Sequence, residues 1–285
     1  MVLKQSWLFG LWLGLSMFSG QHDLKARPLP QSHRTYQTAY AVFVNVAYSF
    51  GDGRGIPKFE IIAKGKKKNP LISRYFPSPV PTVQMSEEVV AMCLTSGADS
   101  LNALAFILGH ELAHHFKRHA LLGMGDSNTK SIDVQESRKL EGEADYFGCF
   151  YAQIAGYQPV SAGISILDKI YKAYDLENQE RGYPPLEDRQ ETLVKVKKMI
   201  APLTSVFQAG QLLYVRGNYE VAYICFEYLV DRFPSRELYS NLGCAYLQAY
   251  LHQFPSDQQG FIYPLEFDAR TRLEKPVPVR VRGQP

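Results

Sequence analysis

The chain has 285 residues, 46% of them hydrophobic, and its 31 Lys and Arg against 28 Asp and Glu leave a formal net charge of +3. This length accommodates one sizeable domain and a smaller one, and the hydrophobic content is ordinary for a globular protein. Acidic and basic residues are interspersed through most of the chain. The composition therefore argues against a nucleic-acid-binding protein, which usually concentrates basic charge on one face.

The first twenty residues have the pattern of a secretory signal peptide. Lys4 precedes an apolar run over residues 7–18, and Ser19 and Gly20 follow it. The run is shorter than the roughly 20 apolar residues of a membrane span. Phe18 occupies a position where cleavage sites usually have a small residue, so a retained N-terminal anchor is the alternative to cleavage. We expect an exported protein, periplasmic or secreted, with no other membrane span.

The next segments predict a linker and a small sheet. Residues 21–35 are polar and contain two prolines, which indicates a linker. Residues 36–48 are rich in Val, Tyr, Phe and Ala and fit either a strand or a short helix. The segment 59–63 predicts a strand, and 83–94 predicts another. Between them, the three prolines of 72–82 predict an irregular or extended chain.

Four helices are predicted after these strands. The first runs from a cap at Asp99 or Ser100 to about residue 120, with leucines at helical spacing that form a buried stripe. The second covers about 134–155, and two more are expected near 161–175 and 186–200.

The first of these helices contains the motif Gly-His-Glu-Leu-Ala-His at residues 109–114. His110 and His114 are four residues apart and project from one helix face, so both imidazoles can reach one metal ion. Zinc accepts imidazole nitrogen, and a catalytic zinc site keeps a position for water. Glu111 lies next to the first ligand and can take a proton from that water.

The alternative interpretation of the motif is a solvated helix face that carries His and Glu. The apolar segment 104–108 before the motif indicates instead a buried helix, in which ionisable groups need partners such as a metal. Gly109 costs about 1 kcal/mol relative to Ala in mid-helix. Its presence there indicates the close approach of another element.

A third ligand is expected from the second helix, at residues 141–145. Glu141 and Asp145 are four residues apart and share a face. Glu141 can bind the metal, and Asp145 can orient a ligand His through its second ring nitrogen. The small residues Gly142 and Ala144 are expected to allow close packing against the first helix. Glu143 is expected to point away into solvent.

Two more histidines, His115 and His119, follow the motif on other faces of the same predicted helix. Lys117 and Arg118 lie between them. We therefore expect both histidines on a basic outer surface, away from the metal.

The two motifs together resemble those of the gluzincin peptidases in the group of the CAAX prenyl protease, HtpX and BepA. Glu-x-x-Ala-Asp at 141–145 begins 27 residues after His114. Further matches are Ala-Gly-Tyr-Gln-Pro at 155–159 and Pro-Pro-Leu-Glu-Asp-Arg at 184–189. Residues 92–97 stand where the group has an edge strand. The likeness covers about residues 36–200.

This resemblance implies roles for individual residues. Glu111 is then the general base, and His110, His114 and Glu141 hold one zinc ion per chain. The group commonly has a His immediately before the Pro-Pro segment, where this chain has Tyr183. Tyr183 either donates a hydrogen bond to the tetrahedral intermediate or packs over the cleft.

The C-terminal part predicts a tetratricopeptide-like repeat. Gly210 and Gly243 are 33 residues apart, close to the 34-residue unit of such repeats. Stable arrays usually need three or more units, so either these helices lean on the preceding domain or the array is cut short. They form either a concave surface that binds a protein partner or a buttress for the catalytic domain. Export permits a disulfide, and Cys225 with Cys244 is the first pair to consider.

We therefore predict an α+β protein with five parts. Residues 1–20 form a signal peptide and 21–35 a linker. Residues 36–202 form a mainly helical, zincin-like peptidase domain with a small antiparallel sheet. Residues 203–255 form the α-helical tetratricopeptide-like hairpin region, and 256–285 form an irregular tail.

The predicted function is that of an exported zinc-dependent endopeptidase acting on protein or unfolded polypeptide substrates. An extended substrate is expected to add to the strand near residues 89–94. The export signal combined with helical repeats resembles BepA-type proteins, which implies a role in envelope protein quality control. The alternative is a non-catalytic chaperone or adaptor that works through its helical repeat and keeps zinc for structure.

Overall fold

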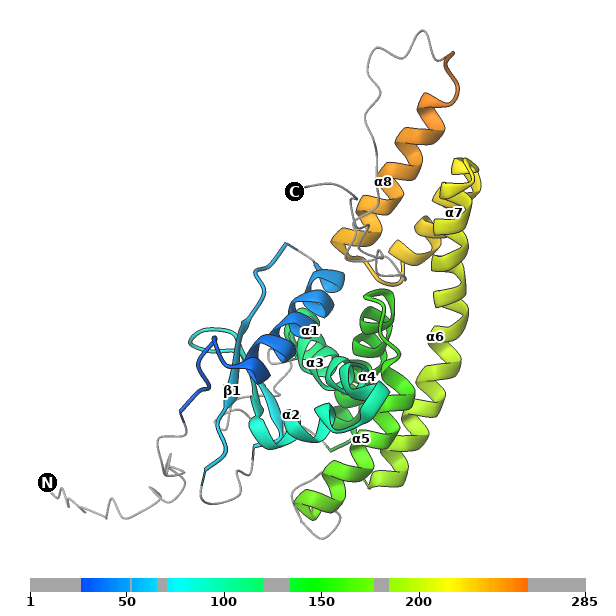
Figure 1. Ribbon diagram of the computed structural model, residues 1–285. Coiled ribbons are helices and arrows are strands. Elements are labelled where there is room, and N and C mark those ends of the chain that lie inside the picture. The colour runs from blue at the N-terminus through cyan, green and yellow to red at the C-terminus, as the bar shows by residue number, and fades with distance from the viewer. Residues whose placement is uncertain (1–26, 52, 66–70, 120–133, 177–184, 256–285) are drawn as a thin grey trace, which may run out of the picture.

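The computed structural model describes residues 27–51, 53–65, 71–119, 134–176 and 185–255. Within these ranges the fold is α+β, as predicted, with most residues in helices and a small sheet at one side (Figure 1). In chain order the elements are α1 (Arg34–Phe50), β1 (Lys58–Ile62), β2 (Ser73–Phe76), β3 (Thr82–Ser86), α2 (Glu87–Leu94), the short 3-10 helix η1 (Gly97–Asp99), α3 (Ser100–Phe116), α4 (Val134–Ile154), α5 (Pro159–Tyr174), α6 (Leu186–Val215), α7 (Tyr219–Val230) and α8 (Arg236–Leu251).

The sheet has three strands in the order β1-β3-β2, and it is mixed. β2 pairs with β3 antiparallel, with Tyr75 opposite Val83, whereas β1 pairs with β3 parallel, with Phe59 opposite Val83. The prediction of an antiparallel sheet was therefore wrong for one of the two pairings. The hairpin that joins β2 to β3 places β2 on one side of β3, so β1 takes the other side through a crossover.

The strand predicted over residues 83–94 was wrong from Glu87 onward, because only its first four residues belong to β3. The chain leaves the sheet at Ser86, whose hydroxyl accepts a hydrogen bond from the backbone N–H of Val89 and caps α2. Glu87 and Glu88 occupy the first turn of α2, where negative charge interacts favourably with the helix dipole. These polar signals override the β-propensity of the apolar residues that follow them.

The four predicted helices are present as α3, α4, α5 and α6. Residues 36–48, which fitted a strand or a helix, belong to helix α1. α6 is longer than predicted and runs without interruption past Pro202, so the predicted domain boundary lies inside one helix. The predicted signal peptide and tail lie outside the described residues, as does the linker up to residue 26. None of the described helices is both long and apolar enough to cross a membrane.

α3 and α4 approach each other through a backbone contact between two glycines. A Cβ atom on Gly109 would lie 2.7 Å from the carbonyl oxygen of Gly148, and one on Gly148 would lie 2.6 Å from the carbonyl carbon of Gly109. The close approach expected at Gly109 is therefore confirmed. Gly142 does not share in this contact, because a Cβ there would meet nothing within 4 Å. Gly148 takes the role that the sequence assigned to Gly142.

The last helices lean on the body of the protein through one aromatic residue. Phe233, in the turn between α7 and α8, is fully buried, and its ring stacks on Phe150 of α4 with centroids 3.7 Å apart. Beside it, the backbone N–H of Arg236 donates a hydrogen bond of 2.7 Å to the carbonyl of Gly51 at the end of α1. These contacts support the expectation that α7 and α8 depend on the preceding domain (Figure 1).

The pairing of Cys225 with Cys244, which the sequence left open, is not formed. Cys225 on α7 and Cys244 on α8 are both free thiols, each partly buried. The two cysteines contribute to packing between neighbouring helices instead of a covalent link.

We expect Gly148→Ala to destabilise the fold. Its methyl group would force the α3 and α4 backbones apart, and overpacking of this kind costs about 1–3 kcal/mol. Gly142→Ala is the matched control on the same helix, and it should stabilise by up to about 1 kcal/mol because Ala is the better helix former. Denaturant unfolding of the two variants measures the difference. Equal stability of both variants would show that the contact does not constrain the packing.

We also expect Phe233→Ala to lower the free energy of unfolding by about 3–5 kcal/mol, since it leaves a large cavity against α4. Tyr239→Ala is the control, because Tyr239 lies on α8 with its side chain exposed. That change should stay within about 0.5 kcal/mol. Thermal or denaturant unfolding checks both values. A loss no larger than that of the control would contradict the packing role of Phe233.

Candidate metal centre

Three predicted ligands converge at one point between α3 and α4. The Nε2 atoms of His110 and His114 lie 3.0 Å apart. The carboxylate of Glu141, on α4, places Oε2 3.1 Å from His110 Nε2 and Oε1 3.6 Å from His114 Nε2. Their ligand atoms all lie within 4.8 Å of one another, so the group can hold a metal ion.

These spacings fit a small tetrahedral ion. Donor atoms about 2.0–2.1 Å from such an ion are separated from one another by about 3.3 Å. Two imidazole nitrogens and one carboxylate oxygen form a donor set that suits first-row transition metals and leaves a coordination position for water. His110 and His114 are buried and Glu141 is partly buried, so the group lies inside the helical body.

His110 is held on its other ring nitrogen by Asp145, as the sequence predicted. The Nδ1 of His110 and Oδ1 of Asp145 are 2.8 Å apart, and Asp145 is almost fully buried. Burial opposes the charge on Asp145, yet Arg189 and His110 together hold the pKa of its carboxyl below the usual range. An ionised Asp145 accepts the Nδ1–H of His110 and leaves Nε2 free for the metal.

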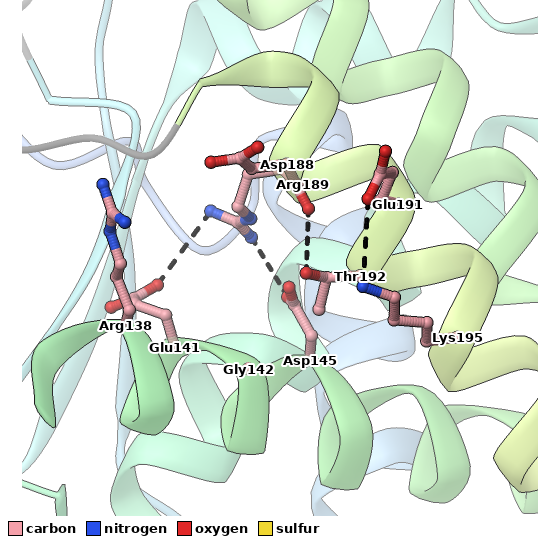
Figure 2. Close-up of a pocket in the computed structure, with 9 residues that line it drawn as sticks. All are labelled: Arg138, Glu141, Gly142, Asp145, Asp188, Arg189, Glu191, Thr192 and Lys195. Atoms are coloured by element: carbon pink, nitrogen blue, oxygen red, sulfur yellow. Dashed lines mark hydrogen bonds and ion pairs between the residues drawn. The ribbon is translucent and has the colours of Figure 1, made fainter. Parts of the chain in front are cut away.

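Arg189 joins α6 to this centre. Its guanidinium donates a 3.0 Å hydrogen bond to Asp145 Oδ1 and lies 4.0 Å from Glu141 Oε2. Figure 2 shows the side chain reaching from α6 toward both carboxylates of α4. From the sequence, Arg189 was noted only as the last residue of the Pro-Pro-Leu-Glu-Asp-Arg segment at 184–189, and no role was predicted for it. Its positive charge stabilises two buried carboxylates that would otherwise repel each other.

Glu111 lies on the face of α3 that meets the sheet. Its Oε1 accepts a 2.7 Å hydrogen bond from the hydroxyl of Ser73 on β2, and Tyr75 supplies a backbone hydrogen bond. Burial raises the pKa of the Glu111 carboxyl, while His110 and Ser73 partly oppose this shift. A carboxyl with a raised pKa can both accept and return a proton near neutral pH. The sequence did not indicate Ser73, because nothing local distinguishes it from other strand residues.

The prediction that His115 and His119 form an outer basic surface was wrong. His115 is buried, with Nδ1 3.0 Å from the hydroxyl of Tyr75. His119 is only 1% exposed, with Nδ1 2.9 Å from Nδ1 of His114. α3 ends at Phe116, and Arg118 adopts a positive φ of 58°, which turns the chain back toward the helix. Helical spacing therefore does not describe residue 119.

Glu143 was predicted to be solvated, and its side chain is only one-third exposed. Its Oε2 lies 3.8 Å from Nε2 of His119. Helical geometry does turn it away from Glu141, but His119, just after α3, lies against that face. Tyr183, whose role the sequence left open, lies outside the described residues.

A cavity of about 250 Å³ lies beside the metal ligands, between α4 and α6 (Figure 2). Its walls carry both signs of charge and include three of the charged groups already described, Glu141, Asp145 and Arg189. The lining residues are Arg138, Glu141, Gly142, Asp145, Asp188, Arg189, Glu191, Thr192 and Lys195. The carboxylate end of the metal centre is therefore reached from the α6 side.

We expect Glu141→Gln to weaken binding of a divalent metal such as cobalt by more than about tenfold, because loss of even an outer partner of a ligand costs 10–100-fold. Glu136→Gln, on an exposed position of the same helix, is the control and should bind as the parent does. Competition with a chromophoric chelator measures both. Equal affinity of the Glu141→Gln variant and the parent would place the ion elsewhere.

No protein-family model matches this chain, and no curated protein matches it in sequence. Inferences about its function therefore depend on the chemistry of the residues gathered between α3, α4, α6 and β2.

Proposed function

We propose that the protein is a zinc-dependent endopeptidase that hydrolyses peptide bonds of protein substrates. The observation that carries this proposal is the convergence of His110, His114 and Glu141 on one point. The carboxyl of Glu111 is buried on α3, the helix that also carries the two histidines. Two imidazoles and one carboxylate are the ligand set of several zinc peptidases. Zinc, when bound, supplies a Lewis acid that polarises the scissile carbonyl and acidifies a water molecule.

Glu111 is the proposed general base. It takes a proton from the attacking water and later passes it to the leaving amine. Burial raises the pKa of its carboxyl, which favours this second transfer. Ser73 and the backbone of Tyr75 hold the carboxyl in place, so its orientation does not depend on the substrate.

The substrate is proposed to bind along β2. Within the described residues β2 is an edge strand, since the sheet order is β1-β3-β2, and two of its residues contact Glu111. An extended peptide that adds to this edge would place its backbone beside the general base. The site expected near residues 89–94 was wrong, because those residues belong to helix α2.

The biological setting proposed here is export and protein quality control in the cell envelope. It is supported by the signal-like N-terminus and by the repeat-like spacing of the C-terminal helices. Unfolded or misassembled polypeptides are the proposed substrates, and the helical repeat is the proposed surface for a protein partner.

A chaperone or adaptor that does not cleave is the second candidate. The observation that favours it is a set of exposed aromatic side chains on α7 and α8, which suits binding of apolar polypeptide segments. These are Tyr228, Tyr239, Tyr246 and Tyr250. Under this candidate the metal would stabilise the crossing of α3 and α4 without chemistry.

Zinc content and cleavage of unfolded casein by the parent and by Glu111→Gln separate the two candidates. We expect one zinc per chain in both proteins, and a rate for Glu111→Gln lower by about 10²–10⁴-fold, the usual contribution of a general base. Equal cleavage by both proteins would reject the peptidase proposal. Zinc bound without cleavage by the parent would favour the chaperone.

A further inference from the structure

We propose that His119 is a positioning residue that fixes the orientation and proton position of the metal ligand His114. This inference depends on the proposed metal site but not on peptidase activity. His119 is almost fully buried, and its ring meets that of His114 edge to face, at 80° with centroids 4.9 Å apart. The two Nδ1 atoms are 2.9 Å apart, which is a hydrogen-bond distance.

The direction of this hydrogen bond follows from the side of His114 that faces the metal. His114 Nε2 points toward His110 and Glu141, so this nitrogen gives its lone pair to the ion. A neutral imidazole carries one proton, and on His114 that proton must then be on Nδ1. His114 therefore donates and the Nδ1 of His119 accepts.

The same argument fixes the proton of His119. Because its Nδ1 accepts, its own proton lies on Nε2. That atom is buried, and among the described residues it has no hydrogen-bond partner. The carboxylate of Glu143 lies close to this atom, with Oε2 3.8 Å away. The proton on Nε2 thus faces a negative charge, which stabilises this tautomer.

Each of the two imidazole ligands consequently has an outer hydrogen-bond partner, and the two partners differ chemically. His110 donates to the ionised carboxylate of Asp145, and His114 donates to the neutral imidazole of His119. Metal-bound histidines almost always donate their second N–H to such a partner, which sets the ring orientation and the strength of the ligand. His119 supplies the partner that the HExxH and Glu-x-x-Ala-Asp motifs do not provide for His114.

Direct coordination by His119 is inconsistent with this geometry. Its Nδ1 lies against Nδ1 of His114, on the far side of that ring from the converging ligand atoms. The neighbouring His115 is no substitute, because its ring nitrogens contact the hydroxyl of Tyr75 and the carbonyl of Gly55.

A matched pair of substitutions tests the proposal. Asn and Leu have the same shape, but only Asn places an acceptor oxygen where Nδ1 of His119 stands. We expect His119→Leu to weaken zinc binding by about 10–100-fold, the range for loss of an outer partner. His119→Asn should restore most of that affinity. Competition with a chromophoric chelator gives the dissociation constants, and cobalt substitution reports the ligand field in the visible spectrum.

Two results would overturn the proposal: zinc affinity and cobalt spectrum of His119→Leu equal to those of the parent, or equal losses in both His119 variants. Thermal unfolding of the metal-free variants and the metal-free parent shows whether a variant that binds zinc more weakly is still folded. If His119→Leu does not fold, Glu143→Gln asks the same question, since it removes the negative charge that faces the Nε2–H and keeps the shape of the side chain. Glu136→Gln removes the same charge from an exposed position of the same helix and is the control. We then expect weaker zinc binding in Glu143→Gln alone, and equal affinities of the two variants would reject the proposal. A parent protein that binds no metal would instead reject the proposed function.

Discussion

The backbones of α3 and α4 touch at Gly109 and Gly148, and this contact sets how close Glu141 comes to His110 and His114. Gly109 directly precedes His110. Gly148 is seven residues, or close to two helical turns, after Glu141, so the face of α4 that meets α3 also presents Glu141. A side chain at either glycine would separate the helices and withdraw Glu141 from the two imidazoles. The mid-helix glycine that lowers the helix propensity of α3 is therefore required by the site.

A second constraint is the charge that this crossing buries. Glu111, Glu141 and Asp145 would be costly to ionise together away from water. Burial raises the pKa of both Glu141 and Asp145. Arg189 lowers the pKa of Asp145, and at Glu141 it adds to the larger lowering effect of His110. A divalent ion between the ligands would contribute in the same direction. The site thus needs the start of α6 as much as it needs α3 and α4. A bound cation would offset the cost of burying three carboxylates together, so an ion-binding centre explains why they are gathered here.

The residues predicted correctly from sequence are those whose geometry is local. His110 with His114, and Glu141 with Asp145, each share one face of a helix, so spacing alone specifies their relation. His119 and Ser73 could not be found this way. The contact of His119 with His114 depends on where α3 ends and on the positive φ of Arg118. The contact of Ser73 with Glu111 depends on which strand lies at the edge of the sheet. The parallel pairing of β1 with β3 was missed for the same reason, because crossovers leave no local pattern.

The continuity of α6 links the metal centre to the C-terminal helices. Its first turn carries Arg189, and Gly210, near its other end, packs against Phe226 of α7. Gly210 follows Arg189 by 21 positions, which corresponds to about 32 Å at the rise of an α-helix. A single helix thus sets the distance between the ligand carboxylates and the α7–α8 pair, and Phe233 attaches that pair again to α4. These two attachments and the hydrogen bond from Arg236 to Gly51 hold the helices in one orientation. Any polypeptide bound on their exposed aromatic side chains would therefore be held at a defined distance from Glu141 and the edge of β2.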